Sequence, residues 1–463
     1  MSIFQVFRKK ETKAADLLLT NEDWKILSSV LFRYVNRDQN INPIVYKTDY
    51  ITKAYLYNAV IYSIISLRAN AAKGIPWLVY KIKNAQKFRQ YQNITRKDLN
   101  LFKTLTLKEQ ALEEVEKSPI NTLIKNPNPY MSFSDIIEGL FVYRDTTGDA
   151  YLYRVDNVST KEIIQLHLLP ADKTKIVGGP FIDPIKGYRV DTIFSEILQP
   201  EKVMHWKYFN PLWDGRGGQL YGISPLVAAV RMINVDNEGV NNEYASFANE
   251  GVKGILTGTE QTEIEFTKEQ GDNLVKKLKK ATERAKAGDG NIAVNRAPLN
   301  YVEIGKSPVD LGELDSRKFN KEIFCNIFRI HPALLSSDAS TLDNLKEARK
   351  SLMTLSVMPD MDSLRENLNT MIRASFGEEW FIDYDIMAIS ELQEDIEKLG
   401  KTLAGMDWIT PDEKRNATNY DDYVPDPNNP AKQIYTNMGQ IPLGYGMDSS
   451  FDKIDEEINK RRK

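Results

Sequence analysis

The sequence predicts an α+β protein in which a mixed domain precedes long helices that flank a small insert. Apolar and polar residues alternate in short runs that are typical of a small antiparallel sheet, at 163–169, 174–178 and 186–194. Apolar residues recur at helical spacing in longer segments, at 222–251, 310–329 and 343–374. The length of 463 residues allows two to four structural units of roughly 100–200 residues each.

The first helix and strand are expected after residue 54. Apolar residues at steps of three and four from Tyr55 to Ala72 predict a helix, which Gly74 would end. The aromatic and partly β-branched run 77–82 predicts a strand. The stretch 84–118 is strongly charged and lacks a clear core face, so a peripheral helix or a solvated excursion is expected there.

A second helix and strand complete the mixed unit. Ser132 or Ser134 would cap a helix that runs through Tyr143. Residues 147–149 would then turn the chain into a strand at 150–155. With the alternating runs, these elements make residues 45–210 a mixed α+β unit.

The second half of the chain begins with a long helix at 222–251 and an insert at 252–308. Within the insert the residues predict a strand, a helix and extended segments, at 252–257, 268–286, 291–295 and 299–304. A returning helix at 310–329 closes the insert.

A polar loop from Ser336 to Asn344 leads from the returning helix to a third long helix that ends at residue 374. Pro359 should kink this helix, because proline lacks an N–H donor and its ring clashes with the preceding turn. A strand at 380–386, a helix at 390–404 and a Pro/Asn-rich tail are expected to follow.

The charge balance disfavours a protein that grips nucleic acid through bulk positive charge. Lys and Arg total 61 against 64 for Asp and Glu, a formal net charge of −3, so contact with DNA must be local, transient or absent. Two regions depart from this balance. Residues 268–286 carry seven basic and three acidic side chains, whereas 378–423 carry thirteen acidic and four basic ones. The basic helix is either a solvated amphipathic helix or a rim that faces a partner or DNA.

The cellular compartment is indicated by what the sequence lacks. Cys325 is the single cysteine, lies in an apolar run and is expected to be a buried small hydrophobe. No apolar stretch approaches the ~20 residues that span a bilayer. The N-terminal residues do not follow the order of a secretory signal. We therefore expect the chain to stay in a cytoplasm unless an assembly carries it out.

Motifs for nucleotide binding are incomplete. Gly305-Lys306-Ser307 ends like a phosphate-binding loop, but the first glycine of that loop is replaced by Asn300. The glycine-dense run 214–222 lacks the spacing of a dinucleotide-binding turn. No catalytic residue and no cofactor is predicted.

Candidate metal ligands are equally weak. The three histidines are far apart in the sequence, at His167, His205 and His331. Two carboxylate pairs have a spacing that could hold a divalent cation. Asp383 and Asp385 are more simply the outward face of a strand, and Asp360 and Asp362 a helix surface. No metal site is predicted.

Several phrases, in a fixed order over residues 50–445, resemble the portal proteins of tailed bacteriophages, specifically their lambdoid-type subfamily. They are Tyr57-Asn58-Ala59-Val60, Gly74-Ile75-Pro76-Trp77, Leu123-Ile124-Lys125-Asn126-Pro127-Asn128, Thr147-Gly148-Asp149-Ala150-Tyr151, Leu168-Leu169-Pro170, His205-Trp206-Lys207, Tyr221-Gly222-Ile223-Ser224-Pro225-Leu226, Phe328-Arg329-Ile330-His331-Pro332, Ile409-Thr410-Pro411-Asp412 and Asn437-Met438-Gly439-Gln440.

The resemblance implies a portal-type fold and a ring, usually of twelve subunits, at one capsid vertex, through which genomic DNA is packaged and ejected. The implied units are an N-terminal segment (1–50), a mixed α/β wing (51–221), two stem helices (222–251 and 309–332), a small α/β clip between them (252–308), a tunnel loop (333–344), a kinked helix with a wing strand (345–387) and a helical crown with a C-terminal tail (388–463).

The resemblance also implies two sets of site residues. A DNA-facing tunnel loop would contain Ser336, Ser337, Asp338, Ser340, Thr341, Asp343 and Asn344. A basic clip rim that faces a partner or DNA would contain Lys276, Lys277, Lys279, Lys280 and Arg284.

Implied partners are further copies of the chain, the major capsid protein, the terminase large subunit, a head–tail adaptor and double-stranded DNA without sequence-specific contact. No membrane or cofactor is implied, and the location would be the virion after assembly in a host cytoplasm. Two alternatives stay open: a metal-dependent nuclease or ATPase of the packaging apparatus, and a capsid adaptor without a channel.

Overall fold

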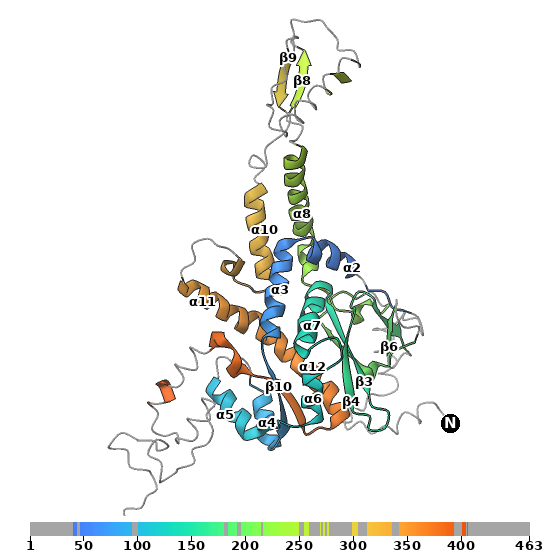
Figure 1. Ribbon diagram of the computed structural model, residues 1–463, viewed down its shortest axis with the longest axis vertical. Helices are drawn as coiled ribbons and strands as arrows, with labels where there is room; N and C mark the ends of the chain where they lie inside the picture. The colour runs from blue at the N-terminus through green and yellow to red at the C-terminus, as the bar shows by residue number, and fades with distance from the viewer. Residues whose placement is uncertain are drawn as a thin grey trace, which may run out of the picture.

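The computed structural model describes residues 40–43, 47–94, 101–179, 184–191, 196–213, 216–249, 254–258, 299–303, 313–335, 342–392 and 401–403, together with residues 269, 272, 273, 276 and 405. Within these residues a mixed α/β body carries two adjacent helices, α8 (Leu226–Asn249) and α10 (Glu313–Ile327), that project from it (Figure 1). Beyond the helices, β8 (Gly254–Gly258) pairs antiparallel with β9 (Leu299–Glu303). The predicted order of helix, insert and helix is present, while most of the predicted helix at 268–286 lies outside the described residues.

Two three-stranded antiparallel sheets form the body. One has the order β10 (Trp380–Tyr384), β1 (Trp77–Ile82), β2 (Leu112–Glu114), and so confirms the strand predicted at 77–82. The other has the order β4 (Ile163–Leu169), β3 (Asp149–Asp156), β7 (Val203–Lys207). Since β1 and β10 are about 300 residues apart in the chain, the first sheet ties the two halves of the chain together.

The prediction of one sheet from the three alternating runs is wrong in its grouping. The first run is β4, whereas β5 (Thr174–Gly178) and β6 (Ile185–Val190) form a separate two-stranded sheet. The separation follows from a tight turn after β4, in which the carbonyl of Pro170 accepts bonds from the N–H groups of Lys173 and Thr174.

A cap and a glycine fix the length of α7 (Phe133–Thr147). Ser132 caps the helix, because its hydroxyl accepts from the Asp135 N–H while the Asp135 carboxylate accepts from the Ser132 N–H. The helix ends at Gly148, whose φ of 86° favours glycine. A Cβ at Gly148 would also lie 2.6 Å from the backbone of Ile223 and Ser224. This turn therefore brings residues 222–224, just before α8, against the end of α7.

The stretch 84–118 contains helices, which was one of the two predicted alternatives, but contrary to the prediction it also has a core face. It forms α4 (Ala85–Gln92), α5 (Leu101–Ala111) and β2, and a separate small core gathers Tyr91, Leu112 and Phe381 with their neighbours. The apolar face was not recognised because it is divided between two short helices, each of which supplies one or two large side chains.

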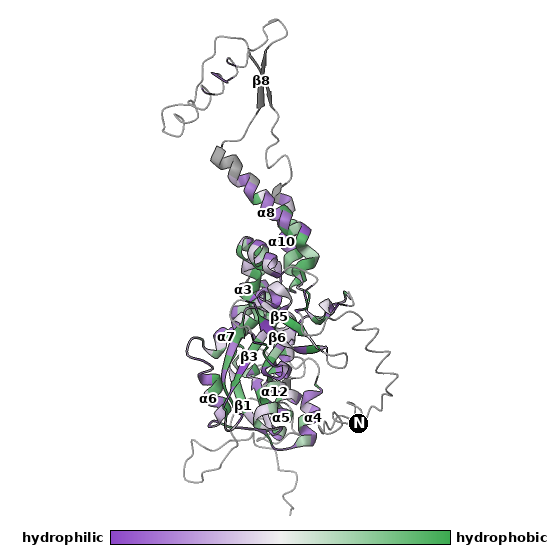
Figure 2. Ribbon diagram, turned by 90° about the vertical axis from the view of Figure 1, so that its right-hand side faces the viewer, coloured by the Kyte–Doolittle hydropathy of each residue, from purple (hydrophilic) through white to green (hydrophobic). Residues whose placement is uncertain are grey.

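Three helices surround the main core. The core lies between α3 (Ala59–Lys73), α7 and α12 (Met358–Phe376), and residues of α8 and α10 nearest the body reach into it. Cys325 of α10 is buried in this core, as predicted. Farther from the body, α8 itself carries both hydrophilic and hydrophobic residues (Figure 2).

The predicted kinked helix is continuous but changes its winding. It consists of α11 (Leu342–Ser351), a π-helical turn η7 (Leu352–Val357) and α12. Pro359 lies in the first turn of α12, where its missing N–H is tolerated, so the irregularity precedes the proline. After β10, the predicted helix at 390–404 begins as a 3₁₀ turn, Ser390–Leu392, and most of it lies outside the described residues.

Candidate functional site

Most residues predicted to line the tunnel loop and the clip rim lie outside the described part of the chain. These are Ser336, Ser337, Asp338, Ser340, Thr341, Lys277, Lys279, Lys280 and Arg284. Lys276 is helical and exposed. Asp343 and Asn344 are exposed residues in the first turn of α11, so their assignment to a loop is wrong. The helix begins earlier because the apolar repeat that includes Leu345 and Ala348 already starts at Leu342.

Polar contacts join the two projecting helices and anchor them to the body. Arg317 of α10 donates to Glu243 of α8 at 2.7 Å and lies 3.6 Å from Asp236. Asp236 is buried and accepts from the side chain of Asn58 at 2.7 Å, and Asn58 caps α3. The pair is therefore held by ionic and amide contacts that fix its position relative to α3.

Large apolar side chains are exposed on α8, on α10 and at the end of a π-helix that contacts α8. The exposed fraction is 73% for Tyr244 of α8 and 61% for Phe319 of α10. Leu56 and Tyr57, at the end of the π-helix η3 (Tyr50–Leu56), are 65% and 79% exposed. Phe319 precedes the buried Phe328 by nine residues, which is two and a half turns at about 3.6 residues per turn, so the two rings point to opposite sides. Such surfaces are typical of association sites.

Both flanks of residues 336–341 are anchored in the described structure. On one side the 3₁₀ turn η6 (Pro332–Leu335) is held by Lys321, whose ammonium donates to the Leu335 carbonyl at 2.8 Å. On the other side α11 continues into η7, where the Ser356 hydroxyl donates to the Phe328 carbonyl at 2.6 Å. The segment thus connects two elements that are both bonded to α10 or its C-terminal end.

Four charged side chains form an ion-pair cluster in the centre of the body. Arg68 of α3 contacts Asp145 of α7 at 2.6 Å and also pairs with Asp360 of α12. Arg144 pairs with Asp360 at 2.8 Å and stacks on the Tyr208 ring. The prediction that Asp360 lies on a helix surface is wrong, because the buried guanidinium groups of Arg68 and Arg144 both pair with its carboxylate.

A second buried carboxylate lies at Asp383 of β10. Its oxygens accept from the Tyr91 hydroxyl and, at 3.3 Å, from Arg365, and Lys108 lies 3.8 Å away. Asp383 is fully buried, so its interpretation as the outward face of a strand is wrong. The alternation of residues along the strand does not predict this burial, because α4 and α5 cover the face of the sheet that was expected to be in solvent.

A third cluster links the N-terminal part of the described chain to the sheet that contains β3 and β7. Asp149 of β3 accepts from Lys47 of α2 (Lys47–Asp49) at 2.9 Å, from His205 of β7 at 2.6 Å and from the Gly222 N–H at 2.7 Å. Burial alone would raise the pKa of Asp149, but Lys47 and His205 outweigh it and the pKa is lowered. The cluster and the bridge from Asn40 to Val177 hold residues 47–49 and 40–43 against the small core of β5 and β6.

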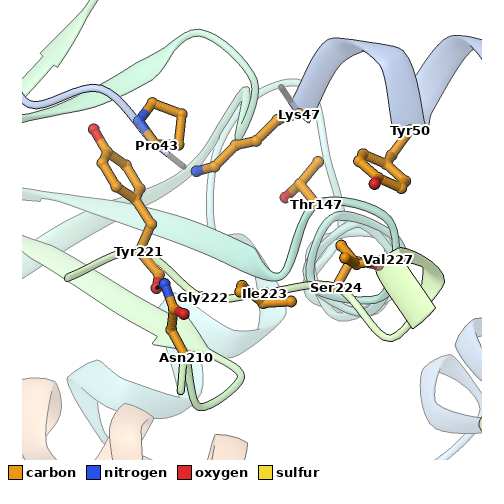
Figure 3. Close-up of a pocket in the computed structure, with 10 residues that line it drawn as sticks. All are labelled: Pro43, Lys47, Tyr50, Thr147, Asn210, Tyr221, Gly222, Ile223, Ser224 and Val227. Atoms are coloured by element: carbon orange, nitrogen blue, oxygen red, sulfur yellow. Dashed lines mark hydrogen bonds between the residues drawn. The ribbon is translucent and has the colours of Figure 1, made fainter. Parts of the chain in front are cut away.

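A small pocket lies beside this cluster (Figure 3). Its lining residues are Pro43, Lys47, Tyr50, Thr147, Asn210, Tyr221, Gly222, Ile223, Ser224 and Val227. Three of the hydroxyls that line it serve structural bonds: Thr147 donates to the Tyr143 carbonyl, Ser224 to the Asp145 carbonyl and Tyr221 to the Ile41 carbonyl. The charge of Lys47 is paired with Asp149. Thr147 and Ser224 therefore help to hold the end of α7 against residues 222–226.

Acid is expected to destabilise the α/β body through His205 of β7. Burial lowers the pKa of His205, and the positive charges of Lys207 and Lys47 lower it further, whereas Asp149 acts in the opposite direction. The rings of Tyr151 and Tyr188 contact the imidazole. In the unfolded chain this imidazole takes up a proton near pH 6.5. Below about pH 6.5 the unfolded state therefore binds more protons, and the free energy of unfolding falls by at most about 1.4 kcal/mol per pH unit until the folded pKa is passed.

Urea unfolding of the wild type and of His205→Gln, at pH values above and below 6.5, measures this effect. The variant should lose part of the acid destabilisation, and the exposed His331→Gln should behave like the wild type. An identical pH dependence in all three proteins would contradict the assignment.

Within the described residues, no three His, Cys, Asp or Glu side chains gather closely enough to hold a metal ion. In the same part of the chain, no helix is both long enough and apolar enough to cross a membrane. The sequence does not predict the three ion-pair clusters, because the members of each cluster come from separate elements. One local signal is present: Arg68 and Arg144 lie within helices that are otherwise strongly apolar.

Comparison with known proteins identifies relatives over most of the chain. The model of a family described as phage portal protein matches residues 59–419. Uncharacterised proteins of Rickettsia bellii and Rickettsia felis are 26% and 24% identical over 377 and 371 residues, which cover 78% of this chain and 86% of each relative.

Solved structures share the fold. A chain in the neck of an empty gene transfer agent (GTA) particle, computed with C6 symmetry, has a TM-score of 0.60 and 18% identity, and the likeness covers 84% of this chain and 97% of that chain. A chain in the neck of a native GTA particle, computed with C12 symmetry, has a TM-score of 0.59 and 17% identity, with 86% and 98% covered. At this level of identity the likeness concerns the fold alone.

Proposed function

The chain belongs to the phage portal protein family, and on this premise we propose that it assembles into a closed ring at one vertex of a capsid. The ring is the channel through which double-stranded DNA is packaged and ejected. It also docks the major capsid protein, the terminase large subunit and a head–tail adaptor. Twelve subunits, the lambdoid-type subfamily and the absence of an enzymatic activity are parts of this proposal.

The observation that carries the ring is the exposed apolar surface on two separate helices. Tyr244 and Phe319 belong to α8 and α10, and the contact between these helices is ionic through Arg317, so their large apolar side chains are left for another partner. A head-to-tail contact between these helices and a neighbouring subunit closes into a ring when the rotation between subunits permits it. Full burial of one such aromatic side chain contributes roughly 1.5–3 kcal/mol to the free energy of association.

The low net charge supports passage of DNA rather than tight binding. Each phosphate that a protein neutralises adds affinity that translocation would have to undo. A chain with a formal charge of −3 therefore suits a channel through which DNA slides. Of the residues predicted for the tunnel loop, Asp343 is acidic and Asn344 is neutral, so neither adds affinity for phosphate.

Phe319→Glu is expected to abolish ring assembly, because it places a charge in the proposed contact between subunits. Electron microscopy and sedimentation of the purified protein should show rings with a central channel for the wild type and monomers for the variant. Thermal unfolding of the isolated subunit should change little, because Phe319 makes no part of the described core.

Two controls make this test specific. Phe319→Leu keeps an apolar side chain and should still form rings. Val158→Glu changes a residue that is 96% exposed in the turn between β3 and β4, outside the two projecting helices, and should also leave assembly intact. Rings of Phe319→Glu equal to those of the wild type, or a wild type that stays monomeric at every salt concentration with and without capsid partners, would refute the proposal.

A further inference from the structure

The projecting helix α8 has an exposed face on the side away from the core. Ile233 is buried in the core, and Arg231, two residues earlier, lies about 200° round the helix from it and is exposed. Val235 and Glu238 follow on the same side as Arg231, and Val235 is 58% exposed. Gly239 lies beside Val235, and in the described structure a Cβ there would meet no atom within 4 Å, so this side of the helix is open. We call Arg231, Val235 and Glu238 the α8 outer face.

The projecting helix α10 has a corresponding exposed face. Arg317 reaches across to Glu243 of α8, so its side of α10 faces α8. Phe319, two residues later, lies about 200° round the helix from Arg317 and points away from α8. Lys318 and Glu322 flank Phe319 and are exposed. We call Lys318, Phe319 and Glu322 the α10 outer face.

The two outer faces lie on opposite sides of the helix pair. Glu238 is two residues from Asp236, and Phe319 is two residues from Arg317, so each lies about 200° from a residue that joins the two helices. A contact between the α10 outer face of one copy and the α8 outer face of the next therefore leaves one face of each kind free to repeat it. Such a head-to-tail contact continues from subunit to subunit, whereas a contact between two α10 outer faces stops at two copies.

The apolar residues of the two outer faces match in level along the helices. The helices run antiparallel, because α8 begins and α10 ends at the body (Figure 1). Arg317 lies close to Asp236 and bonds to Glu243, so its level is between these two residues. Phe319, two residues nearer the body, is then within about one turn of the level of Val235. Rotation about an axis that runs along the pair keeps every residue at its level, so the Phe319 ring of one copy meets Val235 of the next.

The charges of the two outer faces are complementary at these levels. By the same count Lys318 is level with Glu238, and Glu322 lies within about one turn of the level of Arg231. None of these four side chains has an ion-pair partner among the residues that the structure describes. In each case the charge on one face would meet a charge of opposite sign on the other. Charge complementarity therefore favours a second copy of this chain as the partner of both faces.

We infer that the α10 outer face of one subunit docks on the α8 outer face of the next, with the Phe319 ring against Val235 and the four charges in two pairs of opposite sign. The inference rests on the proposed ring and names the two surfaces that meet in it. It also makes ring assembly sensitive to salt, because exposed ion pairs are screened as the ionic strength rises.

Exchange of the charges of Lys318 and Glu238 tests the pairing. Lys318→Glu or Glu238→Lys alone places like charges together and should raise the protein concentration at which half of the chains are in rings by about tenfold. Both substitutions in one chain restore opposite charges and should restore assembly. Since the two residues lie on opposite sides of one helix pair, this restoration reports a contact between chains. Sedimentation at low salt measures the assembly.

Cross-linking of assembled rings gives an independent measurement. Chains that carry both Lys318→Cys and Glu238→Cys should give a ladder of linked subunits with a short thiol-reactive cross-linker, and chains with either substitution alone should not. The native Cys325 is buried and does not take part. Lys318→Cys combined with Val230→Cys is the matched control and should not link, because Val230 lies about 140° round α8 from Val235.

The outcomes separate this contact from the ring itself. Rings in electron micrographs without a link between Lys318→Cys and Glu238→Cys would overturn the inference and leave the proposed ring standing. A doubly exchanged chain that is folded but assembles no better than the single variants would overturn it as well. A wild type that forms no ring would refute the proposed function. Thermal unfolding of the subunits should be the same for all charge variants, because both side chains are exposed.

Discussion

Asp360→Asn is expected to lower the free energy of unfolding by about 3–5 kcal/mol, the range found when one partner of a buried ion pair is removed. Arg68 and Arg144 both pair with this carboxylate, and both guanidinium groups are buried. Without the charge of Asp360, Asp145 is the remaining carboxylate of this cluster, and it would have to neutralise both Arg68 and Arg144. The asparagine keeps the size of the side chain, so the loss reports the charge and not a cavity.

Urea unfolding of the monomeric Phe319→Glu background measures this loss without the contribution of ring assembly. Asp49→Asn is the matched control, because Asp49 pairs with Lys53 on the surface, where both side chains are more than half exposed. Such a pair contributes at most about 1 kcal/mol. Equal effects of the two substitutions would show that the central cluster does not stabilise the body.

Local patterns in the sequence predicted most elements of this fold, because each depends on neighbours within one or two turns. The alternation at 163–169 and the helical spacing at 222–251 are complete within a few residues, and the structure has β4 and α8 there. The grouping of strands was not predictable in this way. It depends on β7, a five-residue strand that pairs with β3 across about 50 residues of chain.

Buried charge is the part of the molecule that local patterns misread. Arg68, Asp145 and Asp360 are polar positions in amphipathic helices, and such positions are usually on the surface. They become neighbours only when α3, α7 and α12 pack together. The same limit applies to the candidate site, since exposure of Phe319 depends on which face of α10 meets the body, and the sequence shows an apolar residue on either side.

Asp383→Asn is expected to cost about 3 kcal/mol of folding stability, again because a buried carboxylate has cationic partners. The substitution leaves Lys108 without the carboxylate 3.8 Å away and leaves Arg365 with Asp362 alone. It also weakens the hydrogen bond that the Tyr91 hydroxyl donates to Asp383. Burial and the charge of Asp383 together raise the pKa of this hydroxyl well above its ordinary value. The loss should appear in urea unfolding, as for Asp360→Asn.

The neighbouring Asp385→Asn provides the control and decides between two functions for this strand. The Asp385 side chain accepts from the Met387 N–H at 2.9 Å, a cap that asparagine makes equally well, so stability should be unchanged. A metal-dependent nuclease or ATPase would need these carboxylates for chemistry. It would lose magnesium-dependent DNA cleavage or nucleotide hydrolysis in both variants at temperatures where they are folded. A portal subunit loses stability in Asp383→Asn alone, because the carboxylate of Asp383 is committed to Tyr91 and Arg365 and holds α4 and α12 against the sheet.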